Sequence, residues 1–573
     1  MRLSNLITVI IILTSFAVKG QDESVILRAM RDELNRNMDE LKSEGYNDPF
    51  FIGYGVTELK TLSINSMNGG IFQSSTDSAR SWYTRVMVGS YQVNDENYND
   101  PKMVFTQDPG YTNLPLDDNY DGIRRSLWIS TNNIYKAAAR LQKSKTDLFK
   151  EIGVDSLPLR DFAKAPKVTF NKRQTIELPD QELWEKRVAQ LSMSLLDFPG
   201  VFRSGVGFFY IGANHFFVNS EHTEIVTPHD LGYLNITTQH IDKDNSVFSE
   251  ELAYIVTSKE DLPEEQVVKE DVETFRTFIE NKSNLQTFDD LYYGPILVEG
   301  NLVSDFFLNA LMAGDLSIIA NRDNMNNNDK GLVQGYISDL QKEIERAPRR
   351  IANPDLNVMA LTHLASYQGE KLLGNFTIDS EGVIPPDTLK LVEKGKLVTQ
   401  LNGRTPVPLA KTSNGHNRLN FNFGGTYKSI TPGILSITSE NSKSSPDLKA
   451  ELLEKAKEMG LEYALIFRPV QTTAITSMFQ TVKIDVETGK ETPTRIDFVD
   501  LSSNISLFRI TGTSSNMIVY NQFWGQGGNG INGVPISTIT PDAILIEGFE
   551  FNGMDNAQSN NKYVPTTPSP LTE

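Results

Sequence analysis

The chain of 573 residues contains no cysteine, which excludes disulfide bonds and thiolate metal ligands. Its stability must therefore come from burial of a core, for which a hydrophobic fraction of 39% is sufficient. Histidine is also scarce, with six residues in the whole chain. A catalytic zinc ion usually has three protein ligands drawn from His, Cys, Asp and Glu. The composition thus leaves few ways to build such a centre.

Positive charge is in the minority, with 54 Lys and Arg against 73 Asp and Glu, a formal net charge of −19. Proteins that bind nucleic acid rely on clustered Lys and Arg to neutralise phosphates. The composition therefore argues against a nucleic-acid partner. An acidic surface favours solubility in general, so the charge by itself identifies no other partner.

Long apolar runs are also lacking, because no stretch approaches the roughly 18 apolar residues of a membrane-spanning helix. Residues 1–20 combine a basic start at Arg2, an apolar run from Leu6 to Val18 and the small residue Gly20. This pattern is typical of a cleavable secretory signal peptide. We expect cleavage after Gly20 and a periplasmic or secreted mature protein with no membrane span. A lipoprotein-type anchor would need a cysteine after the cleavage site.

Residues 21–290 are predicted to form an α+β domain with an antiparallel sheet and long helices. Apolar residues recur at intervals of three and four between Ser24 and Gly45, which predicts an amphipathic helix. Good helix formers after Ser, Thr or Asp predict two more helices, at residues 130–152 and 180–198. Runs rich in aromatic and β-branched residues, interrupted by Gly and Asn, are typical of antiparallel strands. They span residues 50–73 and 81–93.

Residues 291–555 are predicted to form a β-dominated domain, because short β-branched runs alternate there with Gly, Pro and Asn. The expected strands lie within residues 294–300, 388–401, 464–470, 505–512, 516–524 and 542–551. The expected helices lie near residues 303–313, 333–346 and 447–459. The asparagine-rich run at 321–329 predicts an exposed loop, and residues 556–573 predict a disordered tail.

Several motifs, taken in their order along the chain, resemble the TldD/PmbA family, also called modulators of DNA gyrase or TldD-related metallopeptidases. "GPILVEGNLVSDFF" resembles the start of the family's C-terminal domain. "GNFTIDSEGVIPPDTLKLVEKGKLVTQL" is similar to its Asp-x-Glu-Gly turn and the hairpin that follows. "TSNGHNR" stands where the family has a Thr-Gly-Asn-Gly or Thr-Gly-His-type turn, and "ILRAMRDELNRNMDELK" and "IRRSLWISTNNIYKAAARLQ" resemble helices of the secreted branch. The resemblance implies a two-domain α+β protein that dimerises around an internal cavity.

The resemblance also carries an expectation about metal. The TldD branch is a zinc-type peptidase with a His-Glu-x-x-x-His helix and a cysteine near the C-terminus, whereas the TldE or PmbA branch lacks the motif and serves as its partner. Between Gly300 and Gly374, where the motif would fall, this chain has only His363, and none of its histidines precedes Glu. We therefore expect no metal and no cofactor.

Four of the six histidines fall within 26 residues, at His215, His222, His229 and His240. The segment "FFYIGANHFFVNSEHTEIV" predicts a hairpin that turns at about Ser220 and Glu221. Such a hairpin would hold His215 and His222 too far apart for one zinc ion, whose ligands lie about 2 Å from it. We expect these histidines to be ordinary polar positions of the hairpin and its neighbour.

Two other motifs argue against further enzyme classes. "GQGGNG", Gly525 to Gly530, matches G-x-G-x-x-G, but it precedes Pro535 and β-branched residues where a dinucleotide fingerprint would open a helix. The chain contains no G-x-S-x-G, so a nucleophile-elbow serine hydrolase is not supported.

The first candidate site residues lie in "TIDSEGV". Asp379 and Glu381 could act as an acid and base pair. Asp, Ser and Gly are also turn formers, so the same residues favour a structural role in which they cap and shape a turn.

The other candidates lie in "TSNGHNR". Asn414 and Gly415 form a turn dipeptide that favours positive φ, which would present His416 and Arg418 on a loop. A loop of this kind could bind a peptide carboxylate or backbone through the imidazole and the arginine fork. Alternatively, it only pins the hairpin after Leu401 to the domain.

Three functions remain open from the sequence. The first is a non-catalytic, PmbA/TldE-like subunit that shapes a cavity for peptides or unfolded polypeptides and forms a heterodimer with a metal-bearing homologue. The second is an active peptidase with a non-zinc constellation such as Asp379, Glu381 and His416. The third is a peptide-binding envelope homodimer. The missing histidine pair and cysteine favour the first.

Overall fold

The computed structural model describes residues 24–101, 114–241, 247–312, 317–326, 330–422, 425–476, 478–496, 506–525 and 533–552. The predicted signal peptide, the predicted tail and most of the "GQGGNG" run lie outside the described residues. Within these ranges no helix combines the length and the apolar character that a membrane crossing requires.

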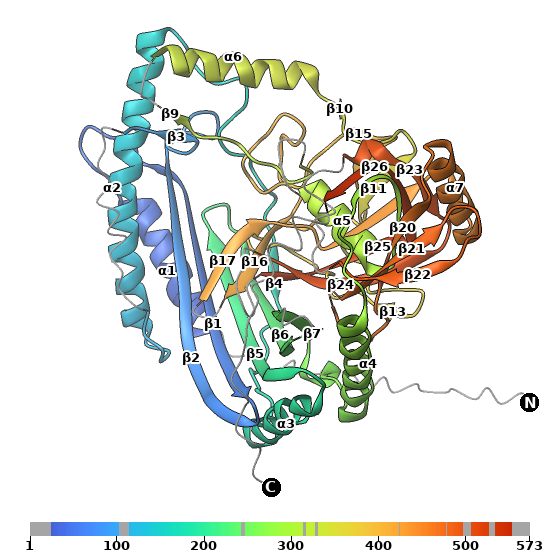
Figure 1. Ribbon diagram of the computed structural model, residues 1–573. Coiled ribbons are helices and arrows are strands. Elements are labelled where there is room, and N and C mark those ends of the chain that lie inside the picture. The colour runs from blue at the N-terminus through green and yellow to red at the C-terminus, as the bar shows by residue number, and fades with distance from the viewer. Residues whose placement is uncertain are drawn as a thin grey trace, which may run out of the picture.

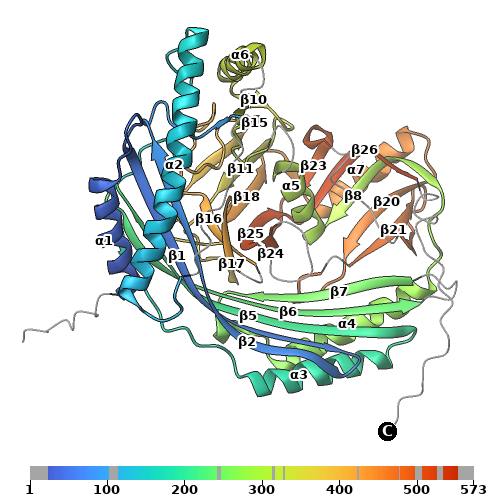
Figure 2. The same ribbon diagram turned by 90° about the vertical axis from the view of Figure 1, so that its left-hand side faces the viewer.

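Two long hairpins build a six-stranded sheet in the first half of the described chain. β1 (Pro49–Met67) pairs antiparallel with β2 (Gly70–Val88), and β5 (Val201–Asn219) pairs antiparallel with β6 (Glu224–Ile241). The strand order is β2-β1-β5-β6-β4, with β4 (Thr169–Asn171) parallel to β6 and β7 (Val247–Val256) also on β6. Figure 2 shows these strands curving beneath the C-terminal part of the chain.

Helices cover one face of this sheet. They are α1 (Val25–Glu40), α2 (Tyr120–Ile152), α3 (Gln181–Ser194) and α4 (Glu265–Asn284), and Figure 1 shows α1 and α2 on the side away from the C-terminal part. Side chains alternate across a strand, so even-numbered residues of β1 and β5, such as Ile52 and Phe208, pack under the helices. Odd-numbered residues such as Leu59 and Ile211 face the other way.

Three helices predicted in this half are confirmed as α1, α2 and α3, although α2 begins ten residues before the predicted start. Helix α4 was not predicted. Its buried residues Val268, Val272, Phe275 and Ile279 do recur at three and four, so the periodic signal was present among the valines and threonines that weaken helix propensity.

Two further sheets dominate the described chain from β8 onward. The first has the order β10 (Arg349–Arg350), β15 (Lys396–Leu397), β14 (Leu389–Glu393), β11 (Leu356–Ala360), β18 (Ile434–Ser439), β25 (Val534–Pro541) and β24 (Met517–Trp524). The second has the order β19 (Ser442–Lys443), β23 (Ile510–Ser514), β26 (Ala543–Asn552), β8 (Leu291–Glu299), β20 (Tyr463–Pro469), β21 (Phe479–Asp485) and β22 (Glu491–Thr494).

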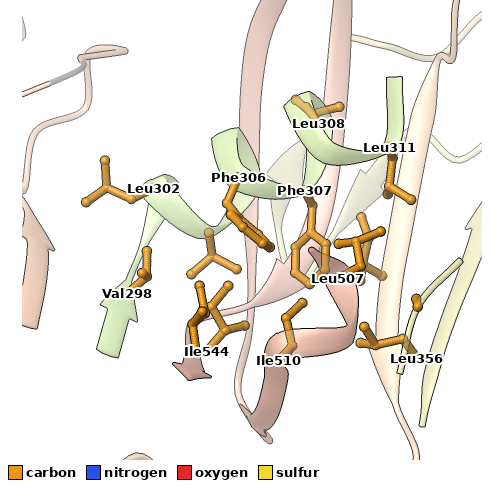
Figure 3. Packing of buried hydrophobic residues seen from close by; sticks show 14 of the residues in the cluster. Val298, Leu302, Phe306, Phe307, Leu308, Leu311, Leu356, Leu507, Ile510 and Ile544 are labelled. Atoms are coloured by element: carbon orange, nitrogen blue, oxygen red, sulfur yellow. The ribbon is translucent and has the colours of Figure 1, made fainter. Parts of the chain in front are cut away.

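Helix α5 (Asn301–Met312) lies in the core that these two sheets share. Phe306 and Phe307 pack with Ile544 of the second sheet and Leu356 of the first, as Figure 3 shows. The predicted helices near 303–313, 333–346 and 447–459 are confirmed. They are α5, α6 (Lys330–Arg346) and α7 (Ser445–Glu458).

The α+β fold class is confirmed by this mixture of antiparallel sheets and helices. The division at residues 290/291 stays a prediction. The exposed loop predicted at 321–329 is wrong at Met325, which is fully buried. Met325 opens β9 (Met325–Asn326), which pairs with β3 (Tyr98–Asn99), and its side chain packs with Phe149 of α2.

The remaining short elements are a β12 (Ser366–Tyr367) and β13 (Glu370–Lys371) pair and the one-turn helices η1 (Leu195–Asp197), η2 (Lys259–Asp261) and η3 (Leu507–Arg509). One hairpin matters for function: β16 (Asn417–Asn422) with β17 (Gly425–Ile430). Leu419 and Phe421 of β16 pack on the helix-free face of the six-stranded sheet. Thr426 of β17 lies 3.1 Å from Ser81 of β2, between the two hydroxyl oxygens.

Candidate functional site

A cavity of about 360 Å³ lies where the β16 hairpin meets the helix-free face of the six-stranded sheet. Its walls come from β6, the segment 373–380, β16 and the start of β25. Of the predicted site residues, Asp379 and Arg418 line this cavity. Glu381 and His416 are buried beside it and do not line its wall.

Asp379 organises the turn that follows it. Its Oδ1 accepts hydrogen bonds from the backbone N–H groups of Glu381 and Val383, both at 2.9 Å, and its Oδ2 accepts one from Asn417 N–H at 3.3 Å. Gly382 has φ +80°, a left-handed conformation that favours glycine. The carboxylate thus caps a turn, as the structural interpretation of "TIDSEGV" expected.

Burial, together with the negative charge of Glu381, raises the pKa of Asp379 to about 7, against the lowering effect of the three backbone donors. A carboxyl group with a raised folded pKa contributes stability below its unfolded pKa of about 4, and that contribution is lost as the pH rises through the folded value. Stability should therefore decline between about pH 4 and pH 7 because of this residue.

Asp379→Asn tests that decline. The amide does not ionise and its oxygen can still accept the turn's hydrogen bonds, so the variant should gain stability relative to wild type as the pH rises from 4 to 8. Urea unfolding at both pH values measures the difference. A wild-type-minus-variant difference that is constant with pH would contradict a raised pKa at this position.

Glu381 belongs to a buried charge cluster. Its Oε1 lies 3.0 Å from Nη1 of Arg85 and 3.0 Å from Nζ of Lys428. Arg85, in β2, also pairs with Glu96 at 2.6 Å. Burial alone would raise the pKa of Glu381, but the charges of Lys428, Arg85 and Arg404 hold it well below its usual range. Glu381 is therefore an ionised anchor between β2 and β17.

Tyr83 and His215 complete the surroundings of this cluster. Lys428 Nζ lies 3.9 Å from the centroid of the Tyr83 ring, a cation–π distance. His215 Nδ1 lies 2.9 Å from Thr57 Oγ1, and its Nε2 lies 3.2 Å from the backbone oxygen of Ser380. Burial lowers the pKa of His215 to about 4, so its neutral ring joins β5 to the Asp379 turn.

The expectation that His416 and Arg418 are presented on a loop is wrong. His416 is fully buried, Arg418 is 7% exposed, and Arg418 lies within β16. The turn itself is correct, because Gly415 has φ +76°. A Cβ at Gly415 would lie 2.7 Å from the backbone nitrogen of Pro385, so the turn is packed against a neighbouring segment that local sequence could not reveal.

The side chains of this turn have structural partners. His416 Nδ1 lies 2.9 Å from the backbone oxygen of Asn414, and its ring packs edge-on against Phe376. Burial lowers the pKa of His416 to about 3. Asn414 Nδ2 donates to Gln400 O at 2.7 Å, and its Oδ1 accepts from Asn402 N–H at 2.8 Å. These contacts match the alternative in which the turn pins the preceding hairpin.

Arg418 differs from its neighbours because it faces the cavity. Its Nη1 donates to the backbone oxygens of Pro432 at 2.6 Å and Pro535 at 3.0 Å. Its guanidinium carbon lies 4.6 Å from the Phe376 ring centroid. Burial lowers the pKa of Arg418 to about 9, still high enough to keep the group charged at neutral pH.

The hairpin predicted around Ser220 is confirmed, since β5 ends at Asn219 and β6 begins at Glu224. His222 lies in the turn, with φ +67°. His215 and His229 lie on adjacent strands, where His215 faces Thr227. In the part of the chain that the structure describes, no three His, Asp or Glu side chains are grouped so that they could hold a metal ion. His363 pairs with Asp387 at 2.6 Å.

Sequence reasoning missed Arg85 and Lys428, the two cations that contact Glu381. They lie 296 and 47 residues from it along the chain. No motif or spacing could have joined three residues from separate elements, because only the docking of the β16–β17 hairpin on the sheet brings them together.

The fold is similar to three solved structures. A proposed modulator of a DNA gyrase from Thermotoga maritima is 14% identical, with a TM-score of 0.49, over 91% of this chain and 99% of that one. A second proposed modulator of DNA gyrase, from Bacteroides thetaiotaomicron, is 13% identical, with a TM-score of 0.48, over 94% of this chain and 100% of that one. TldE from Thermococcus kodakarensis is 13% identical, with a TM-score of 0.48, over 91% of this chain and 99% of that one.

Sequence comparisons add nothing to these likenesses. No family model matches the chain, and no curated protein matches it significantly.

Proposed function

We propose that the chain is a secreted, non-catalytic protein of the TldD/PmbA type that binds peptides in the cavity beside Asp379 and Arg418 and pairs with a metal-bearing homologue. The order of its sequence motifs supports the family. The absence of a His-Glu-x-x-x-His motif supports the non-catalytic role.

The observation that carries the proposal is the state of the three candidate catalytic groups. Asp379 accepts hydrogen bonds from three backbone N–H groups, and Glu381 forms ion pairs with two cations. His416 is hydrogen-bonded to the backbone oxygen of Asn414. A general acid or base must reach a substrate proton at hydrogen-bond distance. Each of these groups is less than 5% exposed, so none is placed for that task.

The serine that lines the cavity is not arranged as a catalytic nucleophile either. Ser380 lines the wall, but its hydroxyl donates to the backbone oxygen of Asn417 at 2.7 Å. The nearby His215 contacts the backbone oxygen of Ser380 and hydrogen-bonds Thr57. A nucleophilic serine needs the imidazole on its hydroxyl, and that pairing is not among the contacts of the described residues.

The mature chain by itself should not cleave unfolded polypeptide, with or without a chelator. Gel and mass-spectrometric assays of an unfolded substrate measure this. Cleavage that survives chelation and further purification, and that is lost in Asp379→Asn or Ser380→Ala, would establish an active peptidase in place of the proposed role.

Pairing is tested separately by light scattering of the mature chain, alone and with a co-secreted homologue that carries the metal motif. We expect a dimer, or a heterodimer when the homologue is supplied. A monomer at high concentration that forms no complex with the homologue would contradict the pairing.

A further inference from the structure

Arg418 is a buried cation that forms no ion pair with any described carboxylate. Long charged side chains are almost never buried unless they are paired. Among the described residues no carboxylate forms an ion pair with Arg418, and its two hydrogen bonds go to backbone carbonyls. The only influence that shifts its pKa is burial, which agrees with the absence of a neighbouring carboxylate.

The guanidinium has a free edge. Both hydrogen bonds to the protein come from Nη1, so the Nε and Nη2 donors have no hydrogen-bond partner in the described chain. This pair of parallel donors is the arrangement that binds a carboxylate through two hydrogen bonds. Since Arg418 lines the cavity, an anion in the cavity could supply the missing partner.

The acidic groups of the cavity do not fill that role. Asp379 accepts its three backbone donors, and Asp230 accepts from Gln174 Nε2 at 3.0 Å. His229, in the same wall, is held neutral because burial lowers its pKa to about 3. Arg418 is thus the buried charge of the wall that lacks a counter-ion.

Apolar and aromatic side chains form part of the remaining wall, which Thr227, Asn375 and Thr377 also line. Phe376 and Phe421 lie against Arg418 and His229, and Leu373, Ile378 and Val534 also contribute. A volume of about 360 Å³ lies near the lower end of the range for ligand sites. Such a space has room for the last residues of a peptide and excludes a folded segment.

We propose that Arg418 binds the α-carboxylate at the C-terminus of a peptide whose last side chain is apolar. This inference rests on the peptide binding proposed above and names the part of the peptide that is recognised. The carboxylate would pair with the Nε–Nη2 edge, and the terminal side chain would contact Phe376 and Phe421.

The test is calorimetric titration of the mature chain with acetyl-Ala-Ala-Phe as the free acid and as the C-terminal amide. Charge-assisted hydrogen bonds predict that the acid binds about ten to a hundred times more tightly than the amide. Arg418→Lys keeps the charge and loses the fork, and Arg418→Met loses both, so the preference should shrink in the first and vanish in the second. Lys172→Gln, an exposed cation at the same cavity, is the matched control and should keep the preference.

Each outcome separates the two proposals. Equal affinity of acid and amide for the wild-type chain would overturn the role of Arg418 and leave peptide binding standing. No binding of either form would overturn peptide binding and this inference with it. Acetyl-phenylalanine that binds as tightly as the tripeptide acid would show that the ligand is a small carboxylic acid, and the peptide terminus would be rejected. If Arg418→Met fails to fold, the wild-type preference and Arg418→Lys still decide.

Discussion

Replacing Glu381 by Gln should lower the free energy of unfolding by about 3 kcal/mol. The neutral amide leaves the partly buried Lys428 without its carboxylate partner, because Lys428 Nζ lies 3.0 Å from Oε1 of the buried Glu381. Arg85 keeps Glu96, so the effect should stand at the lower end of the range for broken buried pairs. Chemical denaturation at pH 7 measures the loss.

The pH dependence gives the same prediction a second readout. The folded pKa of Glu381 is held below its unfolded value, so its stabilisation is present above about pH 4.5 and is lost as the pH falls through the folded pKa. The Gln variant should lack this acid-dependent loss. Glu393→Gln is the control, because its pair with Lys390 is exposed, and it should change stability by less than about 1 kcal/mol. Equal effects of both substitutions would contradict a buried cluster.

Asp161→Asn should cost about 3 to 5 kcal/mol of unfolding free energy. Asp161 Oδ2 lies 2.6 Å from Lys145 Nζ, and both side chains are completely buried. The substitution leaves the ammonium group of Lys145 in the interior, and no other carboxylate of the described residues forms an ion pair with it. Because burial already lowers the pKa of Lys145, the cost should shrink as the pH is raised toward 10 and the lysine becomes neutral more readily.

Helix α2 offers a matched control for this substitution. Lys143 and Asp147 form a 3.1 Å pair on the same helix, but their side chains are more than half exposed. Asp147→Asn should therefore change stability by less than about 1 kcal/mol. Guanidinium denaturation of both variants compares them directly, and a loss in Asp161→Asn no larger than in Asp147→Asn would refute the role of burial.

Local patterns predicted some of the elements that frame the site, although the strands β16, β17 and β25 were not among them. The hairpin of β5 and β6 followed from strand-forming runs on both sides of Ser220, and the turn at Gly415 followed from its Asn-Gly dipeptide, because both depend on backbone preferences of adjacent residues. The interaction of Asp379 with its own turn is equally local, since two of the three backbone N–H groups that donate to it, those of Glu381 and Val383, lie within four residues of it.

Burial and partners were beyond the reach of such patterns. His416 and Arg418 were expected on a loop, yet both are buried because the β16–β17 hairpin packs on a sheet formed some 200 to 350 residues earlier. Met325 was likewise expected in solvent and is buried against α2.

By itself the sequence determined the fold class, the main helices and strands, the lack of a zinc motif and the turns around Asp379 and Gly415, because periodicity, composition and turn chemistry act over a few residues. Only the tertiary structure decided that Glu381 is held by Arg85 and Lys428, and that Arg418 faces a cavity with one edge of its guanidinium unpaired. Those contacts depend on which distant elements pack together. Hydrophobic burial drives that packing and is non-directional, so the local sequence of an element does not show which other element it will pack against.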